Sequence, residues 1–291
     1  MRNRILRWCA LAAVALFVNH LGPVAATARG ATVIVGGGSL TLNLDGNAIA
    51  NGADADYLAY FGVNLTPGQT FMEFARHFTP SQAAGLSVLD FRPQPNPPVV
   101  NFNDIRAGWV RPSSDGLLYG VNGRDPIGAQ PPGRGAESTT FAFDPADITG
   151  TATGVIGTTG ATSFWYSNQA MIDTGSVWLG FGDLTLQYDA SRFVSGGTSG
   201  WYLTNNLLFP ATLFDTTNVS VGFTGGVFTL SGDLVVSPEF HDAWGFQDGL
   251  NVGSFQLTSY AVPEPSSIVM FVGGMAVAFV FAGGRRLSRT A

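Results

Sequence analysis

The chain has 291 residues, of which 12% are charged and 38 are glycine, and its mean hydropathy is +0.21. The glycine content is about twice the usual roughly 7% of a protein chain. With so few charges, the composition excludes a disordered, solvated chain and a helical chain rich in Ala, Glu, Lys and Leu. It favours short β-strands separated by glycine-containing turns.

The N-terminus has the layout of a secretory signal peptide. Three arginines precede an apolar run at 8–18, and small residues follow at 26–28. We therefore expect cleavage after Ala28. The single cysteine, Cys9, lies in the removed segment, so the mature chain would have no disulfide and no thiol ligand.

The first predicted strand of the mature chain lies at 40–44. Its apolar residues stand at every second position, which is typical of a half-buried strand, and it ends at the turn of Asp45 and Gly46.

Several oxygen-bearing side chains follow this strand within 12 residues: Asp45, Asn47, Asn51, Asp54 and Asp56. Carboxylate and amide oxygens are the ligands that calcium prefers, so Asp45, Asn47, Asp54 and Asp56 are candidate calcium ligands. Position five of an EF-hand loop would be Ile49, which excludes that motif. The segment is equally typical of plain turns, and both interpretations stay open. No other cofactor is expected.

One short helix is predicted from Thr70 onward. Thr70 stands three residues before Glu73, the spacing of a capping box. Three phenylalanines between 71 and 78 then share one face, and Pro80 ends the pattern. We expect this helix to pack on the sheet.

The stretch 91–136 differs in composition from the rest. It holds eight of the 16 prolines and five of the 14 arginines of the chain. Because prolines are excluded from central strands, we expect it to be an excursion on the surface of the domain. Its arginines either bind an anionic partner or neutralise the acidic body.

Strand patterns return after this stretch. Alternation runs through 177–181 and 184–188, and its change of phase at Gly182-Asp183 predicts a bulge or a tight hairpin. It continues at 219–236 around two further glycine-containing turns and at 255–257.

Turn signals at this spacing favour an antiparallel sandwich or barrel. We expect an all-β fold, an antiparallel β-sandwich of jelly-roll-like or Ig-like type with one short helix.

The charge of the mature region limits its partners. Between 31 and 262 stand seven arginines and 19 acidic residues, a net charge of −12. Such a surface repels phosphate backbones, so we expect no nucleic-acid binding.

The mature region contains no recognisable catalytic motif. Its two histidines are His77 and His241, and His241 stands between Glu239 and Asp242 in a segment typical of a polar turn. No catalytic residue is assigned. Aromatic residues offer a surface for stacking on sugars if several point outward: Trp165, Tyr166, Trp178, Trp201, Tyr202 and Trp244.

The C-terminus contains three unlike elements in fixed order. Pro263-Glu264-Pro265 precedes an uncharged apolar segment at 268–284, and Arg285, Arg286 and Arg289 follow. Seventeen helical residues span about 25 Å, enough for a short transmembrane helix, and the arginines favour a cytoplasmic C-terminus.

This arrangement resembles the PEP-CTERM sorting signal of bacterial exported proteins. The resemblance covers 263–291 and implies export, anchoring in the membrane and recognition of the Pro-Glu-Pro motif by an exosortase, often in bacteria with an extracellular polysaccharide matrix. It implies nothing about the activity of the domain, because the signal is found on unrelated domains.

The sequence thus predicts a signal peptide at 1–28, an exported domain at 29–262 and a sorting signal at 263–291. We expect a non-enzymatic protein of the cell envelope or extracellular matrix, with the membrane, an exosortase and an exopolysaccharide as partners. The alternative is a secreted polysaccharide-active hydrolase with paired carboxylates, for which Glu73, Glu137 and Glu239 offer material.

Overall fold

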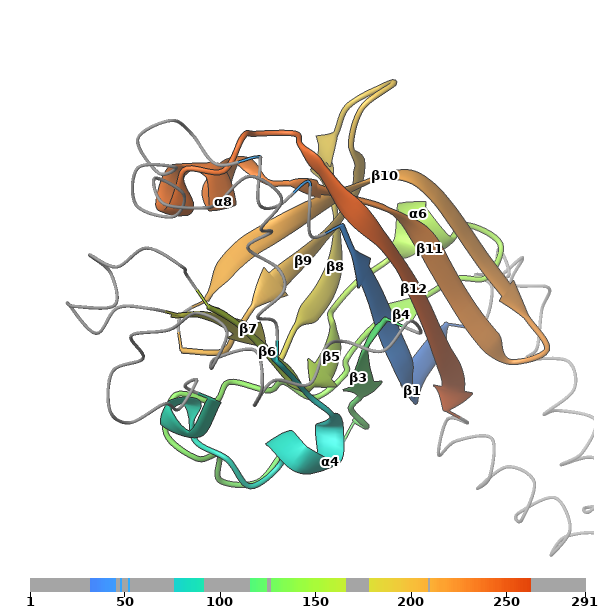
Figure 1. The fold of residues 1–291 in the computed structure, drawn as a ribbon. Coiled ribbons are helices and arrows are strands. Elements are labelled where there is room, and N and C mark those ends of the chain that lie inside the picture. Colours follow the sequence, from blue (N-terminus) through green and yellow to red (C-terminus); the bar gives the residue numbers. More distant parts are fainter. Residues whose placement is uncertain are drawn as a thin grey trace, which may run out of the picture.

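The computed structural model describes residues 32–45, 48, 52, 76–91, 116–124, 127–165, 178–208 and 210–262. These residues form a mostly β structure with a few short helices (Figure 1).

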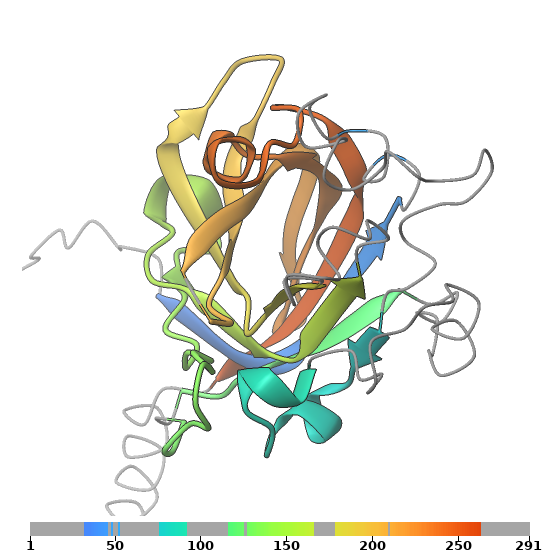
Figure 2. The same ribbon diagram turned by 60° about the vertical axis from the view of Figure 1, so that its left-hand side comes forward.

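A closed antiparallel barrel of eight strands is the main body of the protein. Its strands are β1 (Val33–Leu44), β3 (Leu117–Val121), β5 (Ile156–Thr159), β8 (Thr185–Phe193), β9 (Ser199–Asn205), β10 (Ala211–Thr224), β11 (Val227–Val236) and β12 (Asn251–Val262). They pair in this order, and β12 returns to pair with β1, so the strands form a ring (Figure 2). The expectation of an all-β fold is confirmed.

The more specific expectation of a β-sandwich is wrong. Alternation of apolar and polar residues indicates that a strand has one buried face. Strands have one buried face both in a sandwich and in a barrel, so the pattern does not distinguish the two folds. The pairing of β1 with β12 decides between them, and it joins residues more than 200 positions apart, such as Ile34 and Val262. No local pattern reports such a pairing.

Glycines allow the closing seam between β1 and β12. Gly38 has φ +107°, and a Cβ at this position would lie 2.0 Å from the carbonyl oxygen of Thr258. Gly253, with φ +136°, would meet the carbonyl oxygen of Asn43 at the same distance. The two backbones approach each other in a way that only glycine allows.

The barrel interior is filled by side chains from paired positions of neighbouring strands. Leu40 is paired with Leu257, which is paired with Leu230, and all three are fully buried. On the other side of the ring Tyr188 is paired with Trp201. Burying one such large apolar side chain contributes about 1.5–3 kcal/mol, so the interior is the stabilising core of the molecule.

Smaller elements cover parts of the barrel. A second sheet contains β2 (Arg76–Phe78), β6 (Ala161–Trp165) and β7 (Trp178–Gly182). The others are α4 (Pro80–Ala83), the 3-10 helix η2 (Val88–Phe91), β4 (Ala142–Phe143), α6 (Ile148–Thr151) and α8 (Pro238–Trp244).

The strand predictions are confirmed at 40–44, which lies in β1, at the Gly225-Gly226 turn between β10 and β11, and at 255–257 in β12. The prediction of a second turn, at Gly232-Asp233, is wrong. Gly232 lies inside β11, opposite a bulge of β10 between Thr217 and Ser220.

The change of phase at Gly182-Asp183 is neither a bulge nor a hairpin. β7 belongs to the small sheet and β8 to the barrel, so the chain passes from one sheet to the other at this point. Asp183 makes the turn with φ 44°.

The helix predicted from Thr70 lies mostly outside the described residues. Its last part is wrong, because 76–78 forms strand β2. A short helix with a capping box does occur, at Thr79 and Gln82 of α4.

The prediction that 91–136 is a surface excursion is wrong at 117–121. These residues form β3, which lies between β1 and β5 in the barrel. Leu117 and Tyr119 are buried in the core. The prolines of the stretch lie on either side of this strand, so the overall composition concealed it.

Among the described residues, no helix is long and apolar enough to cross a membrane. The segment predicted to do so, 268–284, lies outside them.

Candidate functional site

An ionic cluster lies at the outside of the barrel, where α8 meets strands β8 to β10. It contains Arg192 of β8, Tyr202 of β9, Asp215 of β10 and Glu239 of α8. The guanidinium of Arg192 donates to Asp215 through Nε at 2.7 Å and Nη2 at 2.9 Å. It also donates to Glu239 through Nη1 at 2.6 Å and Nη2 at 2.9 Å. Both contacts are bidentate, the geometry that gives an arginine its strongest ion pairs.

Local structure explains how Glu239 reaches this position. Ser237 caps α8 by accepting a hydrogen bond from the backbone N–H of Phe240, and Pro238 occupies the first turn. Glu239 then lies in the first turn, where a negative charge is favoured by the helix dipole. The cluster therefore fastens α8 to the barrel wall.

The charges of the ionic cluster control its protonation. Arg192 holds the pKa of the Glu239 carboxyl well below its ordinary value, at about 2. The two carboxylates in turn raise the pKa of Arg192. Tyr202 lies with its ring 4.9 Å from the guanidinium carbon, and burial raises the pKa of its hydroxyl.

The two carboxylates are close enough to suggest glycoside hydrolysis. Their oxygens share Nη2 of Arg192, and a retaining glycosidase places its two carboxyl groups about 5–5.5 Å apart. Such an enzyme also needs one group protonated at its working pH. With a pKa of about 2, Glu239 is ionised at neutral pH, and its charge is already neutralised by Arg192. The arrangement suits attachment of α8 better than acid catalysis.

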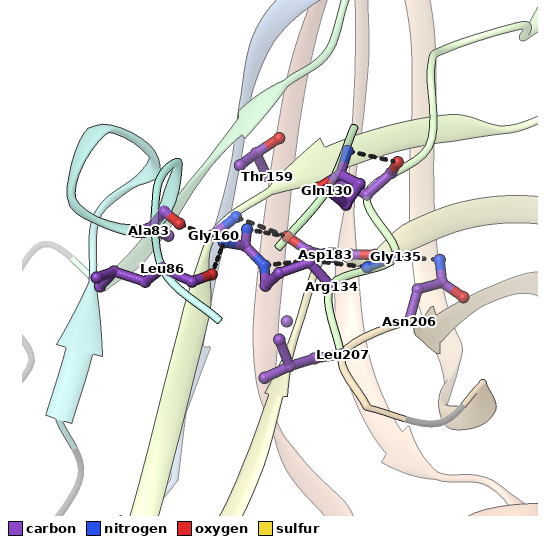
Figure 3. A network of polar contacts seen from close by, with 12 residues as sticks. Ala83, Leu86, Gln130, Arg134, Gly135, Thr159, Gly160, Asp183, Asn206 and Leu207 are labelled. Atoms are coloured by element: carbon purple, nitrogen blue, oxygen red, sulfur yellow. Dashed lines mark hydrogen bonds and ion pairs between the residues drawn. The ribbon is translucent and has the colours of Figure 1, made fainter. Parts of the chain in front are cut away.

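A second cluster is a buried ion pair between Arg134 and Asp183 (Figure 3). The side chain of Arg134 is 1% exposed and that of Asp183 is fully buried. Two guanidinium nitrogens donate to the two carboxylate oxygens, each at 2.6 Å. The backbone N–H groups of Gly135 and Gly160 also donate to this carboxylate.

The remaining donors of Arg134 reach the cover of the barrel. Nη1 donates to the carbonyl oxygens of Ala83 and Leu86, and the guanidinium lies 5.3 Å from the ring centre of Phe91. This ion pair thus joins α4 and η2 to the junction of the two sheets. Arg134 is one of the arginines expected either to bind an anion or to neutralise the acidic body, and it does the latter.

A chain of three hydrogen-bonding side chains lies between the barrel and the small sheet. His77 Nε2 is 3.1 Å from the carbonyl oxygen of Leu118, which can only accept, so this nitrogen carries the proton. In neutral His77, Nδ1 then accepts from the hydroxyl of Thr162 at 3.1 Å, and that hydroxyl accepts from Tyr119 at 2.6 Å. Burial lowers the pKa of His77, which favours this neutral arrangement.

The residues expected to bind calcium are only partly described. Asp45 follows β1, and its carboxylate accepts a hydrogen bond from the backbone N–H of Ala48 at 3.0 Å, as in a turn. Asn47, Asp54 and Asp56 lie outside the described residues. Within the described ranges, no three or more His, Cys, Asp or Glu side chains are grouped so that they could hold a metal ion. Calcium binding stays a prediction.

The residues assigned to export and sorting lie outside the described part of the chain. These are Ala28, Pro263, Glu264, Pro265, Arg285, Arg286 and Arg289. The last described residue, Val262, ends β12 directly before the Pro-Glu-Pro motif.

Comparison of the chain with known protein families, with curated proteins and with solved structures found no match.

The expected aromatic surface is divided between different environments. Trp201 is buried inside the barrel, whereas its neighbour Tyr202 lies half-buried on the outside. For Trp165 and Trp178 the structure describes only the backbone, which is paired across β6 and β7. His241 lies in α8, where its Nδ1 donates to the carbonyl oxygen of Phe246 near the end of the helix.

Sequence reasoning missed the ionic cluster and the buried ion pair. Arg192 and Glu239 stand 47 positions apart, and Arg134 and Asp183 stand 49 apart. One signal was available in the sequence. Asp183 follows a glycine at the point where the apolar alternation changes phase, which indicates a tight turn, and aspartate is one of the residues that adopt positive φ in such turns.

Proposed function

We propose that the chain is an exported, non-enzymatic protein of the cell envelope or extracellular matrix. It is anchored through its C-terminal segment, processed by an exosortase, and carries a barrel domain that binds polysaccharide.

The observation that carries this proposal is the order of elements at the two ends. The arginines, apolar run and small residues up to Ala28 begin the chain, and Pro263-Glu264-Pro265, the apolar segment and the arginine cluster end it. These elements are recognised in different ways. Insertion machinery recognises hydrophobicity and flanking charge, whereas a short polar motif is recognised by a dedicated enzyme.

The domain between these signals supports the proposal. Its β-strands end at Val262, so a folded body reaches the motif with no intervening linker. The barrel is stabilised by a core of apolar side chains and contains no cysteine, which is compatible with folding outside the cell without disulfides.

The non-enzymatic part of the proposal is supported by the ionic cluster. Asp215 and Glu239 lie close enough for one oxygen of each to accept from Nη2 of Arg192, so their negative charges are already paired. A pKa of about 2 leaves Glu239 without a proton to donate at neutral pH. Glu239 is therefore not the proton donor that the alternative, a polysaccharide-active hydrolase, would need.

Replacement of Pro263, Glu264 and Pro265 by alanine tests the proposal. We expect the variant to be exported normally but to stay in the inner membrane at full length, because the apolar segment is unchanged. Cell fractionation and intact-mass analysis measure both properties. A control variant with Ser266 and Ser267 replaced by alanine changes the adjacent residues and should be processed normally. Normal processing and release of the first variant would contradict the exosortase assignment.

A further inference from the structure

The outer surface of β1, β12, β11 and β10 has an unusual composition. These are the longest strands of the described part of the chain, with 12, 12, 10 and 14 residues. At about 3.3 Å per residue and 4.8 Å between strands, they offer a continuous surface about 30 Å long and four strands wide. Figure 1 shows β10, β11 and β12 side by side.

The strand register places three rows of side chains on about 13 Å of this length, from Ser39 to Asn43. The rows alternate with buried positions such as Leu40 and Leu257, so they point away from the core. We call them the outer polar face. The rows are Ser39, Thr258, Thr229 and Gly222; Thr41, Gln256, Ser231 and Ser220; and Asn43, Ser254, Asp233 and Thr217.

The outer polar face is almost free of charge. Asp233 is the one charged residue in these rows, and its carboxylate accepts a hydrogen bond from Asn218 at 2.7 Å. Protein surfaces ordinarily carry about 25–35% charged residues. One charged residue in twelve positions is far below this range and close to the 12% of the whole chain, so the face is as poor in charge as the rest of the molecule.

Its polar groups are available to a ligand. Asn43, Ser220, Thr229 and Gln256 are exposed. Within the described part of the chain, the side chains of Ser39, Thr41, Ser231, Gln256 and Thr258 form no hydrogen bond. Hydroxyl and amide groups both donate and accept, so the face offers both kinds of partner across its whole area.

An aromatic side chain borders the rows. Tyr260 is the next outward residue of β12 after Thr258, and 52% of its surface is exposed. Its ring offers an apolar surface with a hydroxyl at its end. Arg124, whose side chain lies near Gly36, is at the corner of the same region.

We propose that the outer polar face binds an uncharged polysaccharide. This inference rests on the proposed function and names the ligand class and the site. A neutral glycan presents many hydroxyl groups that donate and accept, matches a face of hydroxyls and amides without placing a charge against it, and packs its sugar rings on Tyr260. An anionic polysaccharide would instead meet an acidic domain whose face offers no basic row.

The choice of a glycan over a protein partner follows from the same composition. Protein interfaces have an apolar or aromatic core that supplies their affinity. The rows of the outer polar face have hydroxyl and amide groups at their centre, and their binding energy would come from many hydrogen bonds spread over the surface.

Sedimentation of the full chain, purified in a mild detergent, with polysaccharides tests this inference. The probes are insoluble: cellulose and cross-linked dextran beads, which are uncharged, and cross-linked alginate beads, which are anionic. We expect binding to at least one uncharged polymer and little to alginate. Absence of binding to all three, or a preference for alginate, would overturn the inference. Neither result would affect the exosortase assignment, which is tested by the processing of the Pro-Glu-Pro variant.

Two matched variants locate the site. Ser231→Glu places a carboxylate in the middle of the face, where docking would bury it unpaired, so we expect binding to weaken by about tenfold or more. Ser195→Glu makes the same change in the exposed turn between β8 and β9 and should bind as the unchanged chain does. Unfolding midpoints show that both variants are folded. Equal binding by the two variants would overturn the location.

The second possible occupant is another copy of the chain. If the unchanged protein is a dimer in solution and Ser231→Glu makes it a monomer, the face is an interface between copies and the glycan proposal is wrong. A monomer that binds the uncharged polymer supports it.

Discussion

Replacement of Asp183 by asparagine should strongly destabilise the barrel. Asparagine has the same size and shape and tolerates the positive φ of this position, 44°, so the change removes the charge and little else. Arg134 would then remain buried without its counter-ion.

The structure gives the magnitude of this loss. Breaking a buried ion pair from one side costs about 3–5 kcal/mol. Both carboxylate oxygens of Asp183 also accept backbone hydrogen bonds, from Gly135 and Gly160. In the asparagine variant one of these oxygens becomes an NH2 group, which cannot accept, so at least one hydrogen bond to an N–H donor is lost. For a domain of this size the unfolding midpoint should fall by roughly 6–20 °C.

Thermal and urea unfolding of the full chain, followed by near-ultraviolet circular dichroism, measures the loss. Asp248→Asn is the matched control, because Asp248 is exposed, and it should change stability by less than about 0.5 kcal/mol. Combining Asp183→Asn with Arg134→Met removes both charges and should recover part of the loss. A loss no larger than that of Asp248→Asn, or no recovery in the double variant, would refute this reasoning.

Three further predictions follow. The depressed pKa of Glu239 contributes stability that is fully present above about pH 4.5 and is lost as the pH falls toward 2. Glu239→Gln should therefore reduce the pH dependence of stability measured by urea unfolding at pH 2–6. An unchanged profile would contradict the pairing with Arg192. Gly38→Ala should destabilise the barrel by about 2 kcal/mol or more, because its Cβ would collide with the backbone of β12. Gly37→Ala is the control: its Cβ would meet nothing, so it should cost only about 1–2 kcal/mol for its φ of +73°. Equal losses in urea unfolding would argue against a tight seam. Intact-mass analysis of the exported protein should show an N-terminus after Ala28, and a retained 1–28 segment would exclude a cleaved signal peptide.

The strands were predictable where apolar alternation is complete and local. Leu40 and Leu42 are buried with the expected periodicity, and the Gly225-Gly226 turn lies between paired strands. β3 was not predictable in this way, because the exposed Leu118 breaks its alternation of apolar and polar residues and because it lies in a proline-rich stretch. The closure of the barrel depends on pairing between the two ends of the domain, and local periodicity carries no information about it.

The candidate site was less predictable than the strands. The polar rows of the outer face are visible in the sequence as the alternate positions of amphipathic strands, but their common surface depends on the register of four strands. For Glu239, the sequence offered a carboxylate near a histidine, whereas the structure pairs it with Arg192 of a distant strand. Ion pairs of this kind depend on the tertiary fold, and their partners cannot be chosen from composition.

The seam between the first and last strands determines when the domain can fold during its synthesis. Gly37 and Ser259 are in direct hydrogen-bond contact although 222 positions separate them. Until residues up to 262 have emerged, β1 and β11 each present an unpaired edge that can join with other chains. Contacts of such long range also form slowly. The barrel therefore cannot close until β12 has been synthesised. Truncation before β12 should yield an aggregating product rather than a smaller barrel.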